Sequence, residues 1–355
     1  MAAKPIGERP DNPCPGCGSI RVVAFGSIRL RCKDCGRSFN KKEFPAQKPG
    51  PKPRLVTPRQ NLTHTSSVPV TTGAPRRHIY VPDTQIRKGV PIDHIAWIGQ
   101  YVADHGCDEL ILAGDWWDMP SLSMHDALGS LPMEGARYED DIAAGNAALE
   151  LFVKPIDRLP KAKRPRRRIT LGNHEDRIDR AIMRDPRYAG TIGIHHINAS
   201  RLGFEVHPFL EVVDVDGIWY SHYFAQPLSG RPYGGTVDNR LNKIGHSFTQ
   251  GHEQVFRYSP RTLANGQEQH GLVAGAAYLH AEAYKGLQGN RHWRGIVVKH
   301  EVSNGSYDLM RVSLGYLCRR YEGVPLCVFM AKKYPEWAWL FEGGASGRAD
   351  ETSLA

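Results

Sequence analysis

Five short polar motifs, each at or just past the end of a short apolar run, constrain this chain more than any other feature. The apolar runs cover residues 78–82, 110–113, 168–171, 218–220 and 248–250, and their length is typical of buried β-strands. The motifs are Asp83-Thr84-Gln85, Gly114-Asp115-Trp116-Trp117-Asp118, Gly172-Asn173-His174-Glu175, Ser221-His222 and Gly251-His252-Glu253-Gln254. Because open α/β sheets bind ligands at their strand ends, we expect these side chains to converge on one crevice.

The residue types in these motifs suit a pair of divalent metal ions. Two neighbouring cations lower the pKa of a shared water, so that hydroxide exists at neutral pH. They also neutralise phosphate oxygens as negative charge builds. A histidine with a pKa near neutrality can protonate a departing alkoxide, and a carboxylate partner fixes its tautomer.

The order of the motifs resembles the calcineurin-like metallophosphoesterase superfamily, whose pattern is D-x-H, G-D-x-x-D, G-N-H-(D/E), a lone His and G-H-x-H. The resemblance covers roughly residues 76–320. It implies a four-layer-type α/β sandwich of two mixed sheets flanked by helices. It also implies a metal-bridging hydroxide as the nucleophile, with His174 as the general acid and Asp118 orienting it. The metal ligands implied by position are Asp83, Asp115, Asn173, His222 and His252, with Asp115 bridging the two ions.

Two positions depart from that pattern, and both belong to the first metal. Gln85 stands where the family has the histidine of D-x-H, and Gln254 stands where it has the second histidine of G-H-x-H. With Asp83 and Asp115 they would form an all-oxygen site, which favours Mn²⁺ or Mg²⁺ over Zn²⁺. The D-x-Q variant resembles that of manganese-dependent ADP-ribose pyrophosphatases in the same superfamily. The alternative is a damaged first site, against which the retained ligands and the His174/Asp118 pair argue.

Four further residues are predicted to meet the substrate: Arg177, Arg291, His292 and Arg294. Arg177 follows His174 by three positions, so it is placed to meet a phosphate. The other three lie in the stretch 275–301, where aromatic and basic residues, including Tyr284-Lys285-Gly286, interleave with glycine. Such a stretch suits stacking on bases and contact with phosphates. It also suits an ordinary loop with one packed tryptophan, and both interpretations stay open.

Two C-x-x-C motifs with fourteen residues between them lie near the front of the chain: Cys14-Pro15-Gly16-Cys17 and Cys32-Lys33-Asp34-Cys35. Each is followed by a glycine, Gly18 or Gly36, which permits a tight turn around a metal. Four thiolates form a closed tetrahedral site for one structural Zn²⁺. Two disulfides are the alternative. The module resembles the zinc ribbon at the front of insertion-element transposases, which contacts DNA, although such ribbons also bind protein partners.

The remaining cysteines, Cys107, Cys318 and Cys327, lie among apolar residues and are odd in number, so we expect reduced core thiols. The start Met-Ala-Ala-Lys has no apolar signal core, and no stretch is long and apolar enough to span a membrane. We therefore expect a cytoplasmic protein with no membrane partner.

The positive charge of the chain is concentrated at its front. The whole chain has 46 Lys and Arg against 37 Asp and Glu, a net charge of +9. Residues 1–60 hold thirteen of these bases and four of the acids, which leaves 33 of each in the rest. A basic front segment is the expected footprint of nucleic-acid tethering; a merely solubilising tail is the alternative.

A second basic cluster is predicted at the end of the sheet opposite the metals: Lys161, Lys163, Arg164, Arg166, Arg167 and Arg168.

Composition and periodicity divide the chain into a zinc ribbon over 10–40, a flexible linker rich in Pro and Lys over 41–75, a catalytic domain over 76–342 and a disordered tail over 343–355. Within the catalytic domain, Pro91 is predicted to open a helix that places Ile92, Ile95, Ile98 and Val102 on one face. Further helices are predicted over 138–159 and 177–184, and strands are expected to resume after Glu211.

These features predict a binuclear metal-dependent phosphoesterase that hydrolyses phosphodiester bonds, with DNA as the substrate. The superfamily that the motifs resemble includes DNA-repair exonucleases. A phosphoprotein phosphatase is the second hypothesis, since G-N-H-E matches that branch, but Asp118 is followed by Met119-Pro120 instead of the Arg-Gly of that branch. A DNA-binding protein with a weakened catalytic site is the third.

Overall fold

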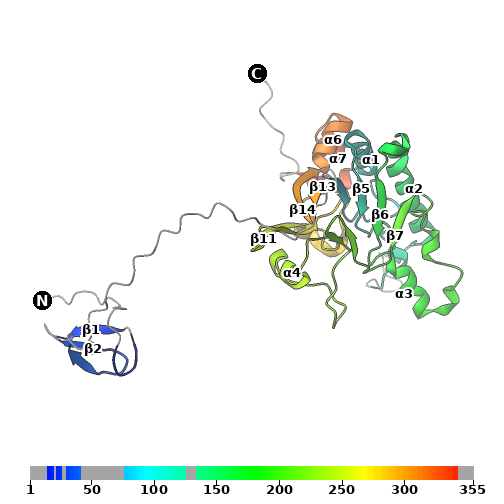
Figure 1. Cartoon of the computed structure of the whole chain (residues 1–355). Coiled ribbons are helices and arrows are strands. Elements are labelled where there is room, and N and C mark those ends of the chain that lie inside the picture. Colours follow the sequence, from blue (N-terminus) through cyan, green and yellow to red (C-terminus); the bar gives the residue numbers. More distant parts are fainter. Residues whose placement is uncertain (1–13, 20, 26–28, 41–75, 125–132, 343–355) are drawn as a thin grey trace, which may run out of the picture. The chain divides into compact units, whose positions relative to one another are not determined.

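The structure is a computed structural model that describes residues 14–19, 21–25, 29–40, 76–124 and 133–342 (Figure 1). These residues form two units, one before and one after residues 41–75, and each is described by itself. The predicted linker, the predicted tail and the first four residues of the predicted ribbon lie outside the described residues. Across the described part, no helix is both long and apolar enough to cross a membrane.

The described residues of the small unit form an antiparallel sheet of three strands: β1 (Val22–Phe25), β2 (Arg29–Cys32) and β3 (Ser38–Asn40). Alternate residues of β2 and β3 are buried, as expected for a sheet with one face toward a core. The core that they form is very small: Cys14, Val22, Leu30, Cys32 and Phe39. A core of this size needs an additional staple to stay folded.

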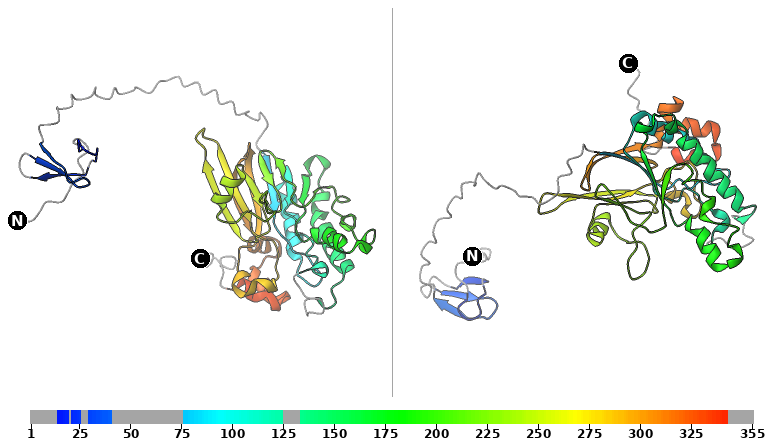
Figure 2. Two further views of the ribbon diagram at one scale, coloured as in Figure 1. Left: turned by 90° about the horizontal axis from the view of Figure 1, so that it is seen from below. Right: turned by 45° about the vertical axis from the view of Figure 1, so that its right-hand side comes forward.

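In the large unit, the described strands form two sheets (Figure 2). The six-stranded sheet has the order β14-β13-β4-β5-β6-β7. Four consecutive strands, β4 to β7, run parallel, whereas β13 and β14 are antiparallel to their neighbours. The strand bounds are β4 (Arg76–Val81), β5 (Glu109–Leu112), β6 (Arg166–Thr170), β7 (Phe204–His207), β13 (Gly295–Ser303) and β14 (Ser306–Ser313).

The five-stranded sheet has the order β11-β12-β10-β9-β8. The strands β12, β10 and β9 are parallel, and the two outer strands are antiparallel to them. The strand bounds are β8 (Val213–Val215), β9 (Ile218–Tyr220), β10 (Phe248–Gln250), β11 (Phe256–Thr262) and β12 (Glu268–Ala274).

The central strands β4 and β5 of the six-stranded sheet are buried on both faces along most of their length. In β4, Tyr80 packs with residues of the other sheet, such as Tyr220 and Leu272, so the two sheets lie face to face. Its neighbours Ile79 and Val81 point the other way, into a core shared with the helices. This alternation follows from the period of two along a strand.

Helices cover the outer face of each sheet (Figure 1). A single core joins the six-stranded sheet to α1 (Asp93–His105), α2 (Tyr138–Asp157), α6 (Leu314–Glu322) and α7 (Leu326–Lys333). The short α4 (Val237–Ile244) packs Val237 and Leu241 on Phe248 and Val273 of the five-stranded sheet. The expected α/β fold, with two mixed sheets flanked by helices, is confirmed.

Most predicted elements are found close to their predicted bounds. The helix after Pro91 is α1, which buries Ile95, Ile98 and Val102 as expected, whereas Ile92 precedes the helix as its N-cap residue. The other two predicted helices are α2 and α3 (Asp176–Arg184). The expectation that strands resume only after Glu211 is wrong, because β7 comes before it.

A fully buried lysine lies between the two sheets. Lys299 of β13 donates from Nζ to the hydroxyl of Tyr220 (2.9 Å) and to Oγ1 of Thr249. Its ammonium group also lies 4.3 Å from the ring centroid of Tyr220 and 4.6 Å from that of Tyr307. Burial away from water holds the pKa of Lys299 well below its usual value.

Replacing Lys299 by Met should change how stability depends on pH. Below about pH 10.4 the unfolded chain binds a proton at Lys299 that the folded chain binds less tightly, so wild-type stability rises with pH. Methionine removes this slope. The stability of Lys299→Met relative to the wild type should therefore fall as pH rises from 7 toward 10, by up to about 1.4 kcal/mol per pH unit. Urea unfolding at several pH values measures it, with the exposed Lys332→Met as control; parallel pH profiles would contradict the prediction.

Candidate metal centre

The five polar motifs meet at the carboxyl ends of strands from both sheets. Asp83, Asp115 and Asn173 follow β4, β5 and β6, and His222 and His252 follow β9 and β10. The two sets are in contact, because Nε2 of His222 lies 3.3 Å from Oδ2 of Asp115. The predicted convergence of these side chains is confirmed.

One half of the centre gathers the acid, amide and imidazole ligands. Oδ1 of Asn173 lies 3.0 Å from Nε2 of His222 and 2.9 Å from Nδ1 of His252. Ligand atoms of Asp115, His222 and His252 all lie within 4.8 Å of one another, close enough to hold one metal ion. Nδ1 of His222 lies 2.8 Å from the carbonyl oxygen of Ala113, which fixes the tautomer that leaves Nε2 as the ligand atom.

The other half contains buried oxygens that have no partner. Oδ2 of Asp83 and Oε1 of Gln85 are both buried without a hydrogen bond. Nε2 of Gln85 donates to Oδ2 of Asp115 at 3.2 Å. Buried acceptors are normally satisfied by a hydrogen bond. The unpaired oxygens of Asp83 and Gln85, near the carboxylate of Asp115, therefore fit a bound cation.

The charges of this centre also fit a cation. Burial raises the pKa of Asp83 to about 7, and the neighbouring Asp115 raises it as well, against the opposing effect of His222. The neighbouring carboxylates of Asp83 and Asp115 repel each other when both are ionised. A divalent cation would remove that repulsion and keep both of them ionised.

Gln254 is placed differently from Gln85. Its Oε1 accepts a hydrogen bond from the hydroxyl of Tyr278 (2.8 Å) and a longer one from that of Tyr284 (3.4 Å). Both tyrosines belong to the segment between β12 and β13. Gln254 is thus at the edge of the centre, and its role as a metal ligand stays a prediction.

The backbone of the centre is held in an unusual conformation. Gln85, Asp115, His252 and Gln254 all have left-handed φ angles, between 48° and 66°. For residues other than glycine this costs on the order of 1–3 kcal/mol each, and such residues cluster at functional sites. Gly251 has a steric reason to be glycine, because a Cβ atom there would lie 2.1 Å from Oδ1 of Asp83.

His174 and Asp118, the predicted general-acid pair, are in contact. Nδ1 of His174 lies 2.8 Å from Oδ1 of Asp118, and its Nε2 is turned toward the centre, 3.7 Å from Oδ2 of Asp115. Arg87 binds the other oxygen of Asp118 at 2.6 Å and so fixes the carboxylate. Burial lowers the pKa of His174, but the carboxylates of Asp115 and Asp118 raise it by more.

Glu175 has a structural role that the sequence analysis missed. Its fully buried carboxylate accepts four backbone N–H bonds of 2.7–3.0 Å. The donors are Asp115, Trp116, Trp117 and Gly172. Glu175 therefore fixes the loop after β5 to the loop after β6. Its place in the Gly-Asn-His-Glu motif was the available signal.

The four predicted substrate residues are not brought together. Arg177 is at the centre, where its guanidinium lies 3.2 Å from Nε2 of His174. Arg291 is exposed, and Nδ1 of His292 bonds to the carbonyl oxygen of Gly289. Arg294 is buried, and its guanidinium donates to the carbonyl oxygens of Tyr278 and Asn290. Those contacts give Arg294 a packing role, and substrate contact by these residues stays a prediction.

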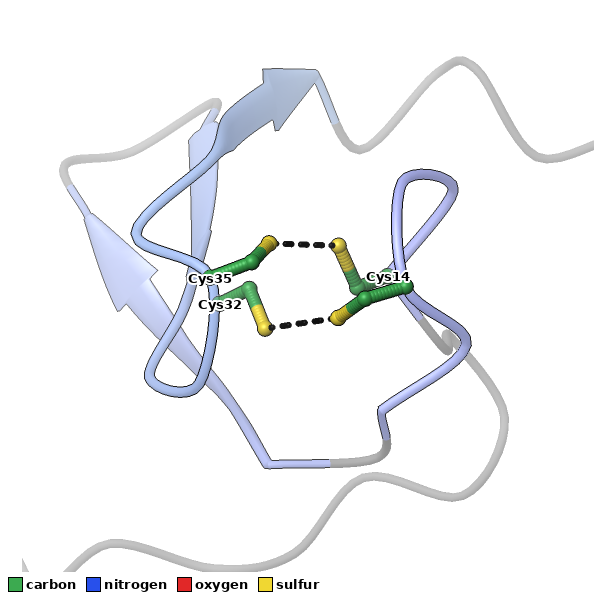
Figure 3. Close-up of side chains that lie close together, drawn as sticks. Cys14, Cys32 and Cys35 are labelled. Atoms are coloured by element: carbon green, nitrogen blue, oxygen red, sulfur yellow. Dashed lines mark hydrogen bonds between the residues drawn. The ribbon is translucent and has the colours of Figure 1, made fainter.

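The four cysteines of the small unit also form a cluster (Figure 3). The Sγ atoms of Cys14 and Cys35 are 3.5 Å apart, and those of Cys17 and Cys32 are 3.6 Å apart. A disulfide requires about 2.05 Å, whereas thiolates at about 2.3 Å from one tetrahedral zinc are about 3.8 Å apart. Gly18 and Gly36 have φ angles of 73° and 72°, which is the turn expected of them. The geometry fits a metal site.

The basic cluster at 161–168 lies at the opposite end of the sheet, as predicted. Arg166 begins β6, and the other end of that strand leads to Asn173. A cleft of about 640 Å³ opens at this end, lined by Arg76, Arg77, Lys163 and Arg166 among others. Much of its charge is balanced internally, since Arg76 pairs with Glu109 and Asp216.

The described residues therefore contain two groups that could hold metal ions: a four-cysteine cluster and an Asp/His cluster extended by Asn173. No protein-family model matches this chain, and no curated protein matches it significantly.

Proposed function

We propose that this chain is a binuclear metal-dependent phosphoesterase of the calcineurin-like type, which hydrolyses phosphodiester bonds in DNA. The observation that supports this most is the pair of unpartnered buried oxygens, on Asp83 and Gln85, beside a carboxylate that also contacts His222. Such an arrangement provides two adjacent cation positions that share Asp115. Binuclear sites of this kind serve the displacement of phosphate esters.

Each half of the centre would hold one ion. The first would use the oxygens of Asp83, Gln85 and Asp115, with Gln254 at its edge, and oxygen ligands favour Mn²⁺ or Mg²⁺. The second would use Asn173, His222 and His252 together with Asp115. Two bound cations activate a water as the nucleophile and neutralise the charge that develops on the phosphate. The cysteine cluster would hold one structural Zn²⁺.

The surrounding residues would handle the leaving group. His174 presents Nε2 to the centre, and Asp118 holds the ring by its Nδ1 atom. Protonated His174 can therefore deliver a proton to the departing oxygen, a step that contributes about 10²- to 10⁴-fold in rate. Arg177, next to Nε2 of His174, supplies positive charge for a phosphate oxygen.

DNA is the proposed substrate because of the front of the chain. Residues 1–60 carry the whole net charge of +9, and a basic zinc ribbon suits tethering to a polyanion. The Gly-Asn-His-Glu motif keeps a phosphoprotein phosphatase as the second candidate. That candidate lacks the arginine expected after Asp118, where the chain has the buried Met119.

The purified full chain tests this proposal with Mn²⁺, Mg²⁺ or Zn²⁺ added in turn. The substrates are bis(4-nitrophenyl) phosphate, 4-nitrophenyl phosphate, single- and double-stranded DNA, and a phosphoserine peptide. We expect the diester to be hydrolysed faster than the monoester, best with Mn²⁺, and DNA to be cleaved. Intact DNA alongside hydrolysis of other esters would reject DNA as the substrate, and phosphate release from the peptide would favour the phosphatase. Failure to hydrolyse any of them would favour the DNA-binding protein with a weakened site.

A further inference from the structure

The segment between β12 and β13 contains a short loop with a fixed base. It includes η7 (Ala283–Lys285) and α5 (Gly286–Gly289). The buried side chain of Asn290 closes the loop, since it binds the backbone N–H and C=O of Glu282 and the carbonyl oxygen of Gly286. These three bonds tie the two ends of the loop together and fix its shape.

This loop contacts two residues that border the metal centre, Arg87 and Gln254. At its base, Oε1 of Glu282 lies 2.8 Å from Arg87, the same arginine that binds Asp118. Farther along, the hydroxyl of Tyr284 reaches Oε1 of Gln254. The loop therefore spans from the general-acid pair to the edge of the first metal position.

The tip of the loop contains an aromatic and a cationic residue, Tyr284 and Lys285, next to each other in the sequence. Tyr284 is 70% exposed, and its hydroxyl reaches Oε1 of Gln254. Nζ of Lys285 donates to the hydroxyl of Tyr278 at 3.2 Å, and that hydroxyl in turn donates to Gln254. An ammonium has three donors, so Lys285 can bind an anion while it keeps this bond.

We propose that Tyr284 and Lys285 form a nucleotide subsite at the edge of the metal centre. The exposed ring of Tyr284 stacks on the base next to the scissile phosphate, and Lys285 pairs with an oxygen of that phosphate. Every base has a π face, so stacking of this kind accepts any sequence. The inference rests on the proposed phosphodiesterase function and specifies the substrate as a nucleotide ester.

The test compares two diesters that share the same leaving group. Thymidine 5′-(4-nitrophenyl phosphate) has a base, and methyl 4-nitrophenyl phosphate does not. Tyr284→Ala should lower the ratio of kcat/KM for the first over the second about tenfold, the order expected for one stacked base. Tyr284→Phe keeps the ring and should keep most of the ratio. Tyr188→Ala, which removes an exposed tyrosine elsewhere, is the matched control.

Lys285→Met tests the phosphate contact of the subsite separately from the base contact. Because both diesters contain the phosphate, this variant should lower kcat/KM for both by a similar factor, about tenfold. The ratio between the two substrates should stay near the wild-type value. Unchanged kinetics on both diesters would overturn the assignment of Lys285.

A binding measurement distinguishes failure of the subsite from failure of the proposed function. Titration calorimetry with thymidine 5′-monophosphate and Mn²⁺ should show a Kd about tenfold higher for Tyr284→Ala than for the wild type. Hydrolysis of both diesters with unchanged ratio and Kd in Tyr284→Ala overturns the subsite and leaves the enzyme. Weakened nucleotide binding without any wild-type hydrolysis keeps the subsite and overturns the enzyme. Neither hydrolysis nor binding by the wild type overturns both.

Discussion

Replacing Asp115 by Asn should lower phosphodiester hydrolysis about 10³-fold, which corresponds to about 4 kcal/mol of transition-state stabilisation. Asp115 is the residue shared by both halves of the centre: its Oδ2 lies 3.3 Å from Nε2 of His222 and 3.2 Å from Nε2 of Gln85. Asparagine has the same shape but lacks the negative charge, and its amide places a donor where a cation would bind. Both ions should therefore bind more weakly, not one alone.

The measurement has an activity part and a binding part. Hydrolysis of bis(4-nitrophenyl) phosphate gives the first, and titration calorimetry with Mn²⁺ gives the second. Asp179→Asn is the matched control, because Asp179 is exposed on α3, the helix that follows Asn173 and His174. Full activity in Asp115→Asn would contradict the proposed enzyme and favour a DNA-binding role. Loss of activity with unchanged Mn²⁺ binding would show that Asp115 acts by another means than metal binding. One such role is to orient His174, since Asp115 accepts a hydrogen bond from its backbone N–H.

The parts of the centre that could be predicted are those with a local signal. A short apolar run followed by a polar motif marks the end of a buried strand. All five predicted strands match β4, β5, β6, β9 and β10 to within two residues. The direction of the strands then decides at which end of the sheet the polar residues lie. The prediction that the basic cluster lies at the opposite end of the strands was correct for the same reason.

The parts that were missed depend on contacts between distant segments. The role of Glu175 arises because donors from residues 115–117 and from Gly172 reach one carboxylate. The burial of Arg294 depends on the ring of Tyr278, 4.2 Å from its guanidinium. β7 is an edge strand of four residues, Phe204–His207, paired only with β6 in the described part, and so short an alternation has little predictive power. Apart from the place of Glu175 in the Gly-Asn-His-Glu motif, no local pattern reports such contacts.

Replacing Cys32 by Ser should remove one zinc ion per chain and unfold the small unit. The described core of that unit has five residues, and Cys14 and Cys32 are two of them. With so little apolar surface to bury, the free energy of metal binding supplies most of the free energy of folding. In zinc-finger peptides the apparent free energy of zinc binding is about 10–16 kcal/mol. Three remaining thiolates cannot close the tetrahedral site. The large unit has cores of its own and should unfold at an unchanged temperature.

Zinc content and protection of backbone amides in residues 14–40 measure this effect. Cys327→Ser is the matched control, because Cys327 is a half-buried free cysteine that packs against the core of the large unit. The competing hypothesis, two disulfides, predicts a different pattern of sensitivity. A zinc site is destroyed by a chelator and resists a mild reductant, whereas disulfides respond the other way. If the ribbon tethers DNA, Cys32→Ser should also slow DNA cleavage at physiological salt while hydrolysis of bis(4-nitrophenyl) phosphate continues. Equal loss on both substrates would show that the ribbon supports the catalytic unit itself, because a tether acts only on a substrate that it binds.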